Sequence, residues 1–176
     1  MCILVAYASK HGATEGIAER IGERLRAAGL EVEVRPARAV RDLAAYDAFV
    51  VGSAVYMFHW MKEAARFLRR NQAVLAEQPV WLFSSGPLGT EAEDPQGHDL
   101  LAVSAPKEIA ELEEAVIARG HRVFFGAFHR GKPSGFGERM VAIMPAARAT
   151  FPEGDFRDWD DIGNWAESIA HELSED

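Results

Sequence analysis

The chain has 176 residues, of which 48% are hydrophobic, and its 19 Lys and Arg against 27 Asp and Glu give a net charge of −8. This ordinary globular composition predicts one domain over residues 1–176. A single cysteine, no zinc-spaced Cys/His cluster and no apolar run near the roughly 20 residues of a membrane span exclude a disulfide scaffold, a zinc module and a transmembrane protein. We therefore expect a cytoplasmic protein with no metal site and, lacking a basic patch with aromatics, no nucleic-acid partner.

Strands and helices alternate along the chain. Continuous apolar runs predict strands buried on both faces, the strict alternation of Leu30–Val34 predicts an edge strand, and apolar stripes at helical spacing predict helices. In chain order we expect a strand at Cys2–Tyr7, a helix at Thr14–Ala28, strands at Leu30–Val34 and Ala48–Gly52, a helix at Trp60–Asn71, a strand at Val80–Phe83, a helix at Pro106–Arg119, a strand at Val123–Phe128 and a helix at Asp158–Leu173.

This order predicts an α/β fold, a three-layer, doubly wound, five-stranded parallel sheet joined by right-handed crossovers. One stretch does not fit the alternation, an insert at about 130–157 between the fifth strand and the last helix. A loop of this length inside a compact domain is usually functional or disordered.

The loop after the first strand has the composition of a phosphate site. Its two hydroxyls, its glycine and the helix start behind it supply donors for a dianion. It is neither a Walker A loop nor a G-x-G-x-x-G fingerprint. The alternative is an ordinary strand–helix turn capped by Thr14. The residues of the loop are Ser9, Lys10, His11, Gly12, Ala13 and Thr14.

Ser9-x-x-Gly12-x-Thr14 resembles the phosphate loop of the flavodoxin family, which binds FMN. The resemblance implies FMN as cofactor and the strand order 2-1-3-4-5, with the ligand at the switch point. The family's other two flavin loops follow the third and fourth strands. The residues at these places are Ser53, Ala54, Val55, Tyr56 and Met57, and Ser84, Ser85, Gly86, Pro87, Leu88 and Gly89.

Within that family the chain looks most like the bacterial menaquinone-dependent protoporphyrinogen oxidases. The likeness rests on Gly52-Ser53-Ala54 with the later His59, on the long insert and on Asp158-Trp159 at the start of the last helix. It implies a flavin-dependent oxidoreductase that passes electrons from a reduced donor, such as protoporphyrinogen, to a quinone-type acceptor. The alternative is a flavodoxin that carries electrons to a redox partner protein and has no substrate of its own.

We expect specific roles for two side chains and one segment. Tyr56 is expected to stack on the flavin ring. His59 is the candidate catalytic group, because histidine is the residue type best suited to pass a proton to a reduced flavin, and the alternative is a solvated loop histidine. The segment from Phe136 to Met144 is a short amphipathic element, either a lid or a docking surface for a quinone, a membrane or a partner. Because the insert carries charges of both signs, we expect at most weak peripheral membrane contact.

Overall fold

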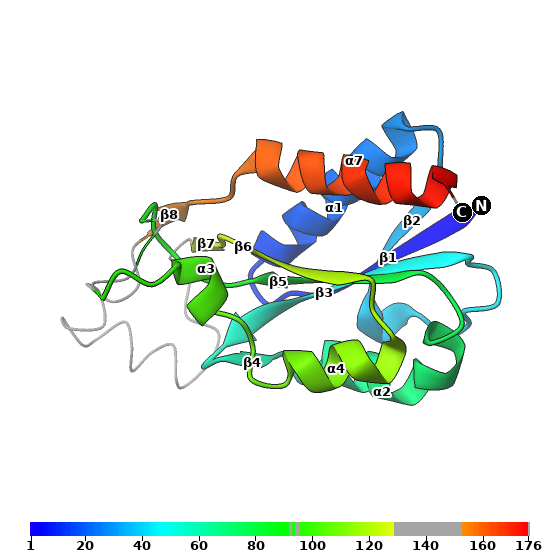
Figure 1. Ribbon diagram of the computed structural model, residues 1–176, viewed down its shortest axis with the longest axis horizontal. Coiled ribbons are helices and arrows are strands. Elements are labelled where there is room, and N and C mark those ends of the chain that lie inside the picture. Colours follow the sequence, from blue (N-terminus) through cyan, green and yellow to red (C-terminus); the bar gives the residue numbers. More distant parts are fainter. Residues whose placement is uncertain (92, 94–95, 129–152, 176) are drawn as a thin grey trace.

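The computed structural model describes residues 1–91, 93, 96–128 and 153–175. Its centre is a parallel sheet in the order β2-β1-β3-β5-β6 (Figure 1). These five strands are the five that the sequence predicts, so the predicted fold class and the order 2-1-3-4-5 are confirmed. The strands are β1 at Cys2–Ala8, β2 at Glu31–Pro36, β3 at Ala48–Tyr56, β5 at Val80–Ser85 and β6 at Gly120–Phe124.

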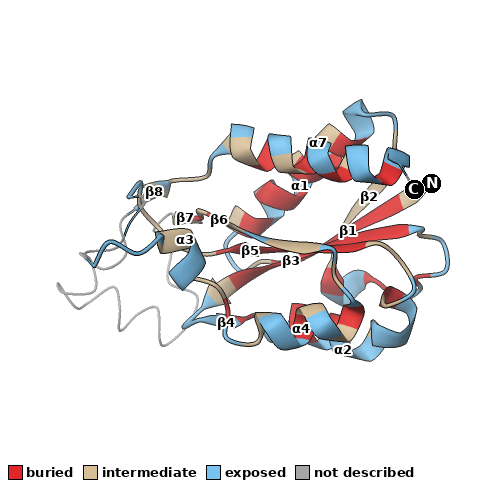
Figure 2. Cartoon of the chain, viewed as in Figure 1, coloured by how far each residue is buried: buried red, intermediate tan, exposed pale blue. Residues whose placement is uncertain are grey.

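Helices cover both faces of the sheet. Helices α1 (Ala13–Ala27) and α7 (Trp159–Glu175) pack together on one face, and α2 (Lys62–Leu75) and α4 (Ile109–Val116) pack together on the other. Because successive side chains of a strand point to opposite faces, one strand supplies both cores. Along β1, Ile3, Val5 and Tyr7 enter the α1/α7 core, and Leu4, Ala6 and Ala8 enter the other. Figure 2 shows β1, β3 and β5 buried along most of their length.

Short elements lie at or near the ends of these strands. Strand β4 (His59–Trp60) pairs with the end of β3. A turn of 3₁₀-helix (Ala37–Ala39) follows β2, and the short helix α3 (Leu100–Val103) lies between β5 and α4 in the chain. Strands β7 (Ala127–Phe128) and β8 (Gly154–Asp155) form a separate antiparallel pair.

Several predicted boundaries are wrong by a few residues: β3 continues to Tyr56, α2 continues to Leu75, and the helix predicted at Pro106–Arg119 is shorter. Two further differences change the course of the chain. Trp60, predicted to begin a helix, lies in strand β4, because the chain first turns back as a hairpin, and α2 begins at Lys62. The predicted fifth strand at Val123–Phe128 begins earlier and is cut after Phe124. There the Phe124 carbonyl accepts the Gly86 N–H, and Gly126 passes so close to the Gly86 carbonyl that a Cβ on it would lie 3.3 Å away. The chain therefore leaves the sheet at this point.

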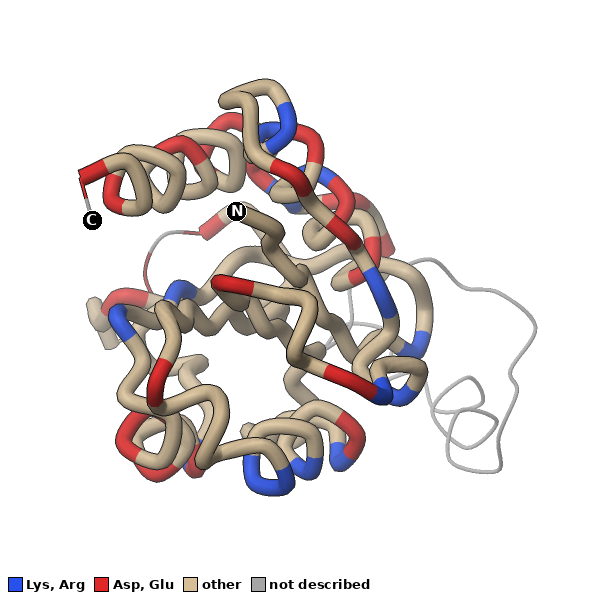
Figure 3. The backbone as a smooth tube through the Cα atoms, turned by 90° about the vertical axis from the view of Figure 1, so that its right-hand side faces the viewer, with Lys and Arg blue, Asp and Glu red and all other residues tan. Residues whose placement is uncertain are grey.

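Helices α2 and α7, which lie on opposite faces of the sheet, differ in charge (Figure 3). Helix α2 carries Lys62, Arg66, Arg69 and Arg70 against Glu63 alone. Helix α7 has no Lys or Arg, and its acidic residues are Asp160, Asp161, Glu167, Glu172 and Glu175. Among the described residues, no helix combines the length and the apolar character that crossing a membrane requires.

Candidate cofactor site

Three loops meet at the carboxyl edge of the sheet, where β1, β3 and β5 end side by side. In the register of the sheet, Ala8 lies opposite Ser53, and Ser53 lies opposite Ser84. The connection after β1 leads to the edge strand β2, whereas the connection after β3 leads the other way, to β5. Such a change of direction separates the loops and is where ligands bind in open α/β sheets.

The first loop leads from β1 into α1. Gly12 precedes the helix with a φ of 85°, a left-handed conformation that favours glycine, and its N–H donates to Ser9 Oγ at 3.1 Å. Thr14 lies in the first turn and is fully buried, yet its Oγ1 has no hydrogen-bond partner among the described residues. Lys10 and His11 are exposed, and Ala13 is half-buried.

A buried hydroxyl without a partner costs about 1–3 kcal/mol. Here it stands at the positive end of a 15-residue helix whose first N–H groups have no intrahelical acceptor. A phosphate oxygen would satisfy both the hydroxyl and the helix end. The residues of this loop therefore fit a phosphate group.

The second loop is a tight hairpin between β3 and β4. Tyr56 pairs with His59, so the turn consists of Met57 and Phe58, whose φ angles are 52° and 62°. A two-residue turn of this kind normally takes Asn-Gly or Asp-Gly, because other residues are strained at positive φ. The turn is also apolar and open to solvent, with 44%, 86% and 52% of Tyr56, Met57 and Phe58 exposed.

Neighbouring segments hold the hairpin in this conformation. The backbone N–H of Lys107 donates to the Phe58 carbonyl at 3.0 Å, and the N–H of Met61 donates to Ser53 Oγ at 2.9 Å. Ser53 in turn donates to the carbonyl of Ala54. The surrounding structure therefore fixes the strained turn, which persists only where it is held in this way.

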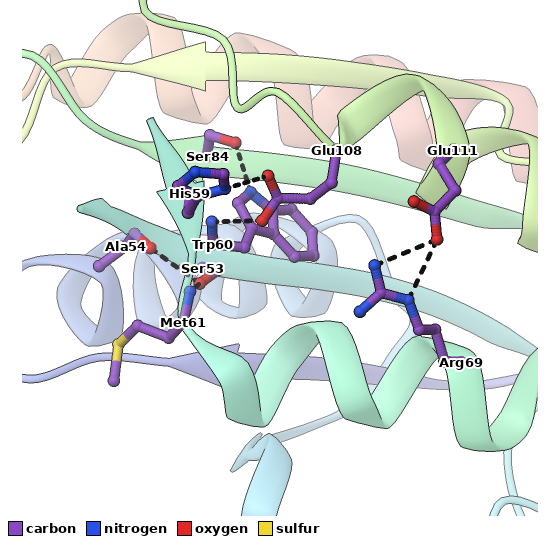
Figure 4. Close-up of polar contacts among 9 residues, drawn as sticks. All are labelled: Ser53, Ala54, His59, Trp60, Met61, Arg69, Ser84, Glu108 and Glu111. Carbon is purple, nitrogen blue, oxygen red and sulfur yellow. Dashed lines mark hydrogen bonds and ion pairs between the residues drawn. The ribbon is translucent and has the colours of Figure 1, made fainter. Parts of the chain in front are cut away.

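Glu108 is the main attachment of the hairpin (Figure 4). Its carboxylate accepts the backbone N–H of Trp60 at 2.9 Å and lies 2.9 Å from His59 Nδ1. Burial alone would raise the pKa of Glu108, but hydrogen bonds from its own N–H, from Trp60 and from His59 outweigh burial and lower this pKa. His59 is thus exposed but bonded to Glu108, and both its proposed proton transfer and the alternative of a solvated loop histidine stay predictions.

The third loop follows β5 and is anchored through side chains. Trp60 Nε1 donates to Ser84 Oγ at 2.8 Å, and the same oxygen lies 2.8 Å from His121 Nε2. Burial lowers the pKa of His121 to about 4, so its ring is neutral at pH 7 and Nε2 can accept the Ser84 proton. The Ser84 hydroxyl thus already has two hydrogen-bond partners within the protein. Ser85 is buried, and Gly86, Pro87, Leu88 and Gly89 are half-buried.

The structure brings the three predicted loops to one edge, and sequence reasoning missed the groups that anchor two of them. Glu108 lies 49 residues from His59, and His121 lies 37 residues from Ser84. No spacing links residues so far apart. The predicted amphipathic element around Phe136, Met140, Val141, Ile143 and Met144, with Arg139 and Arg148, lies outside the described residues.

A doubly wound parallel sheet with loops at its switch point defines a class of α/β ligand-binding domains. The family model for the flavodoxin domain matches residues 4–132, and the chain belongs to this family. A search of curated protein sequences finds no significant match.

Solved structures show the same fold at low sequence identity. An oxidised flavodoxin 2 from Bacillus cereus is 22% identical, with a TM-score of 0.62 over 98% of this chain and 99% of that one. An archaeal flavodoxin is 17% identical, with a TM-score of 0.59 over 99% of both chains. Rubredoxin oxygen:oxidoreductase from Desulfovibrio gigas is 14% identical, with a TM-score of 0.60, and this chain covers 36% of it. The flavodoxin-like fold suggests a flavin redox protein.

Proposed function

We propose that this protein binds FMN noncovalently at the three loops and transfers electrons between a reduced donor and a redox partner or quinone-type acceptor. The observation that carries the proposal is the buried, unpartnered hydroxyl of Thr14 at the start of α1. Membership of the flavodoxin-domain family and the flavodoxin neighbours support it.

Each loop has a defined task in this proposal. The Ser9–Thr14 loop holds the phosphate, the hairpin at Tyr56 and Met57 covers the ring system, and the backbone of Ser85–Gly89 borders the far end of the ring. The flavin supplies the redox chemistry, whereas the protein supplies binding, orientation and exclusion of water. A hairpin that the protein already holds in shape needs little ordering when the ring binds.

The binding test compares two flavins that differ only in the phosphate. Because the proposal assigns Thr14 and the start of α1 to the phosphate, FMN is expected to bind at least about tenfold more tightly than riboflavin, the value of one hydrogen bond to a charged group. Affinities are measured by quenching of flavin fluorescence. Equal affinities would contradict the assignment of a phosphate site to this loop and, with it, the proposed function.

The enzyme of protoporphyrinogen oxidase type and the carrier are separated by activity. The resemblance to the protoporphyrinogen oxidase type rests in part on Asp158-Trp159. In the structure, the Asp158 carboxylate accepts the N–H groups of Asp160 and Asp161 at the start of α7. This cap is an ordinary structural role, so it favours neither function. The FMN-loaded protein is mixed with protoporphyrinogen and a menaquinone analogue. Steady turnover indicates the enzyme, and its absence together with reduction of the flavin by a low-potential donor indicates the carrier.

A further inference from the structure

The segment Gly154–Arg157, which leads into α7, contacts the first candidate cofactor loop directly and is linked to the third loop through Gly126. It lies with β7 beyond the carboxyl ends of the sheet strands (Figure 1). The two links start from different residues of the segment, Arg157 for the first loop and Phe156 for the third. This arrangement differs from a plain connection, which needs no bond to either loop.

Contact with the third loop runs through Gly126. The N–H of Phe156 donates to the Gly126 carbonyl at 3.1 Å, and the N–H of Gly126 donates to the Pro87 carbonyl at 2.9 Å. Any side chain on Gly126 would crowd the Gly86 carbonyl at 3.3 Å. Backbone groups alone therefore join Phe156 to Pro87 through one intermediate residue.

Contact with the first loop runs through Arg157. Its Nη1 donates to the Ala13 carbonyl at 3.1 Å, while Nε and Nη2 donate to the two carboxylate oxygens of Asp155 at 2.7 and 2.6 Å. The guanidinium also stacks on Trp159, 4.3 Å from the ring centroid. With 13% of its side chain exposed, Arg157 is held on three sides.

Helix α1 leaves space for this guanidinium. Gly16 faces it, and a Cβ added at Gly16 would lie 2.5 Å from Arg157 Nη1. Gly16 also donates its N–H to the Gly12 carbonyl at 3.0 Å, so the residue that accommodates Arg157 is bonded to the glycine of the phosphate loop. A shift of Arg157 would therefore also displace the phosphate loop, because Arg157 contacts Ala13 and faces Gly16.

We propose that residues 154–157 brace the candidate cofactor site by fixing the distance between the Ser9–Thr14 loop and the Ser84–Gly89 loop, with Arg157 as the positioning residue. This rests on the proposed function, in which FMN reaches from one loop to the other. Loops fixed at the right spacing lower the entropy lost on binding. By linkage, FMN bound across both loops must stabilise the brace to the same extent.

The test uses the full chain with Arg157→Ala, Arg157→Lys and Gly16→Ala, and with Arg24→Ala as matched control. Arg24 also joins α1 to α7, through Glu167 at 3.2 Å, but contacts neither loop. Two quantities are measured: the ratio of FMN to riboflavin affinity, and the hydrogen exchange of the flavin-free protein in residues 9–16 and 84–89.

Arg157→Ala is expected to lower the FMN affinity about tenfold or more, with a smaller loss for riboflavin, and to speed exchange in both loops while β1 and β3 stay protected. Arg157→Lys is expected to lose less, because one ammonium reaches the Ala13 carbonyl but cannot also bind Asp155 with a fork. Gly16→Ala, which displaces the guanidinium, is expected to resemble Arg157→Ala. Arg24→Ala is expected to change neither quantity.

An FMN affinity within twofold of the wild type in Arg157→Ala, or faster exchange spread over the whole sheet, would overturn the brace. Should Arg157→Ala fail to fold, Arg157→Lys and Gly16→Ala decide by the same two quantities. A wild type that binds no FMN would overturn the proposed function instead. The exchange of the two loops in the flavin-free protein would then still decide whether the brace exists.

Discussion

The first and second candidate cofactor loops end adjacent strands, and their polar groups are satisfied in opposite ways. After β1, the buried hydroxyl of Thr14 has no partner among the described residues. After β3, Lys107 donates to the strained turn at Phe58, and Glu108 and Ser53 accept N–H groups of the residues that follow the turn. The first loop thus leaves a buried hydroxyl unsatisfied, whereas hydrogen bonds already hold the second loop in one conformation. A ligand spanning both would gain hydrogen bonds from the first and a prepared surface from the second.

The largest expected effect follows from releasing the second loop. Glu108→Ala is expected to reduce the free energy of unfolding by about 3 kcal/mol, because two hydrogen bonds to a charged group are lost at about 1.5 kcal/mol each. Urea unfolding measures this change. Glu111→Ala is the control on the neighbouring turn, since its ion pair with Arg69 is exposed (Figure 4). Equal losses in the two variants would contradict the special role of Glu108.

Thr14→Val tests the first loop and has effects of opposite sign on two quantities. Without flavin, the free energy of unfolding is expected to rise by about 1 kcal/mol, because a buried hydroxyl without a partner is removed. FMN binding is expected to weaken by about 2 kcal/mol, because a hydrogen bond to a charged phosphate is lost. Chemical unfolding and fluorescence titration measure the two. Ser9→Ala, which removes the acceptor of the Gly12 N–H, is expected to lower stability instead.

Tyr56→Ala tests the surface that the second loop offers. The affinity for FMN is expected to fall by about 1 kcal/mol, the value of an aromatic stack. The free energy of unfolding is expected to fall by no more than in the control, because the ring is half exposed. Val74→Ala, similarly exposed on α2, is the control. If neither the affinity nor the flavin fluorescence changes, another side chain covers the ring.

The smallest effect appears only on acidification. The folded-state pKa of His121 is lowered to about 4, below the ordinary 6.5, so the unfolded chain binds more protons between these values. Its contribution to stability is therefore complete above pH 6.5 and is lost as the pH falls toward 4. Between pH 7 and 5.5 this loss is about 1 kcal/mol. Urea unfolding at both pH values should show a flatter dependence for His121→Gln, and an unaltered one for the exposed His171→Gln.

The fold could be predicted because the pattern of apolar residues within each strand and helix is enough to recognise that element. The apolar runs of β1, β3 and β5 and the alternation near β2 are complete within each strand, and their order fixes a parallel sheet. The start of β6 was missed because Gly120, His121 and Arg122 are not apolar. The hairpin at Met57 and Phe58 was missed because it lacks the Asn-Gly or Asp-Gly of a two-residue turn.

The candidate site could be predicted only where its polar residues lie close together in the sequence. Ser9, Gly12 and Thr14 stand within six residues, so their hydroxyls and helix start show in the sequence. The partners of Trp60 are Glu108 and Ser84, which become its neighbours only when β4 folds back and the segment before α4 comes to lie beside it. Side-chain contacts of this kind depend on packing between layers, which no local pattern encodes.

The basic residues of α2 and the acidic residues of α7 create electric fields of opposite sign close to these two helices. Glu111, Glu113 and Glu114 of α4 weaken the field beside α2, so the positive field is confined to the exposed side of that helix. A negative surface that approaches the protein is therefore attracted near α2 and repelled near α7. This effect acts during diffusional approach, before any contact forms, over roughly the 8–10 Å that physiological salt leaves unscreened. The charges of single helices thus bias the orientation in which a charged body first meets the protein.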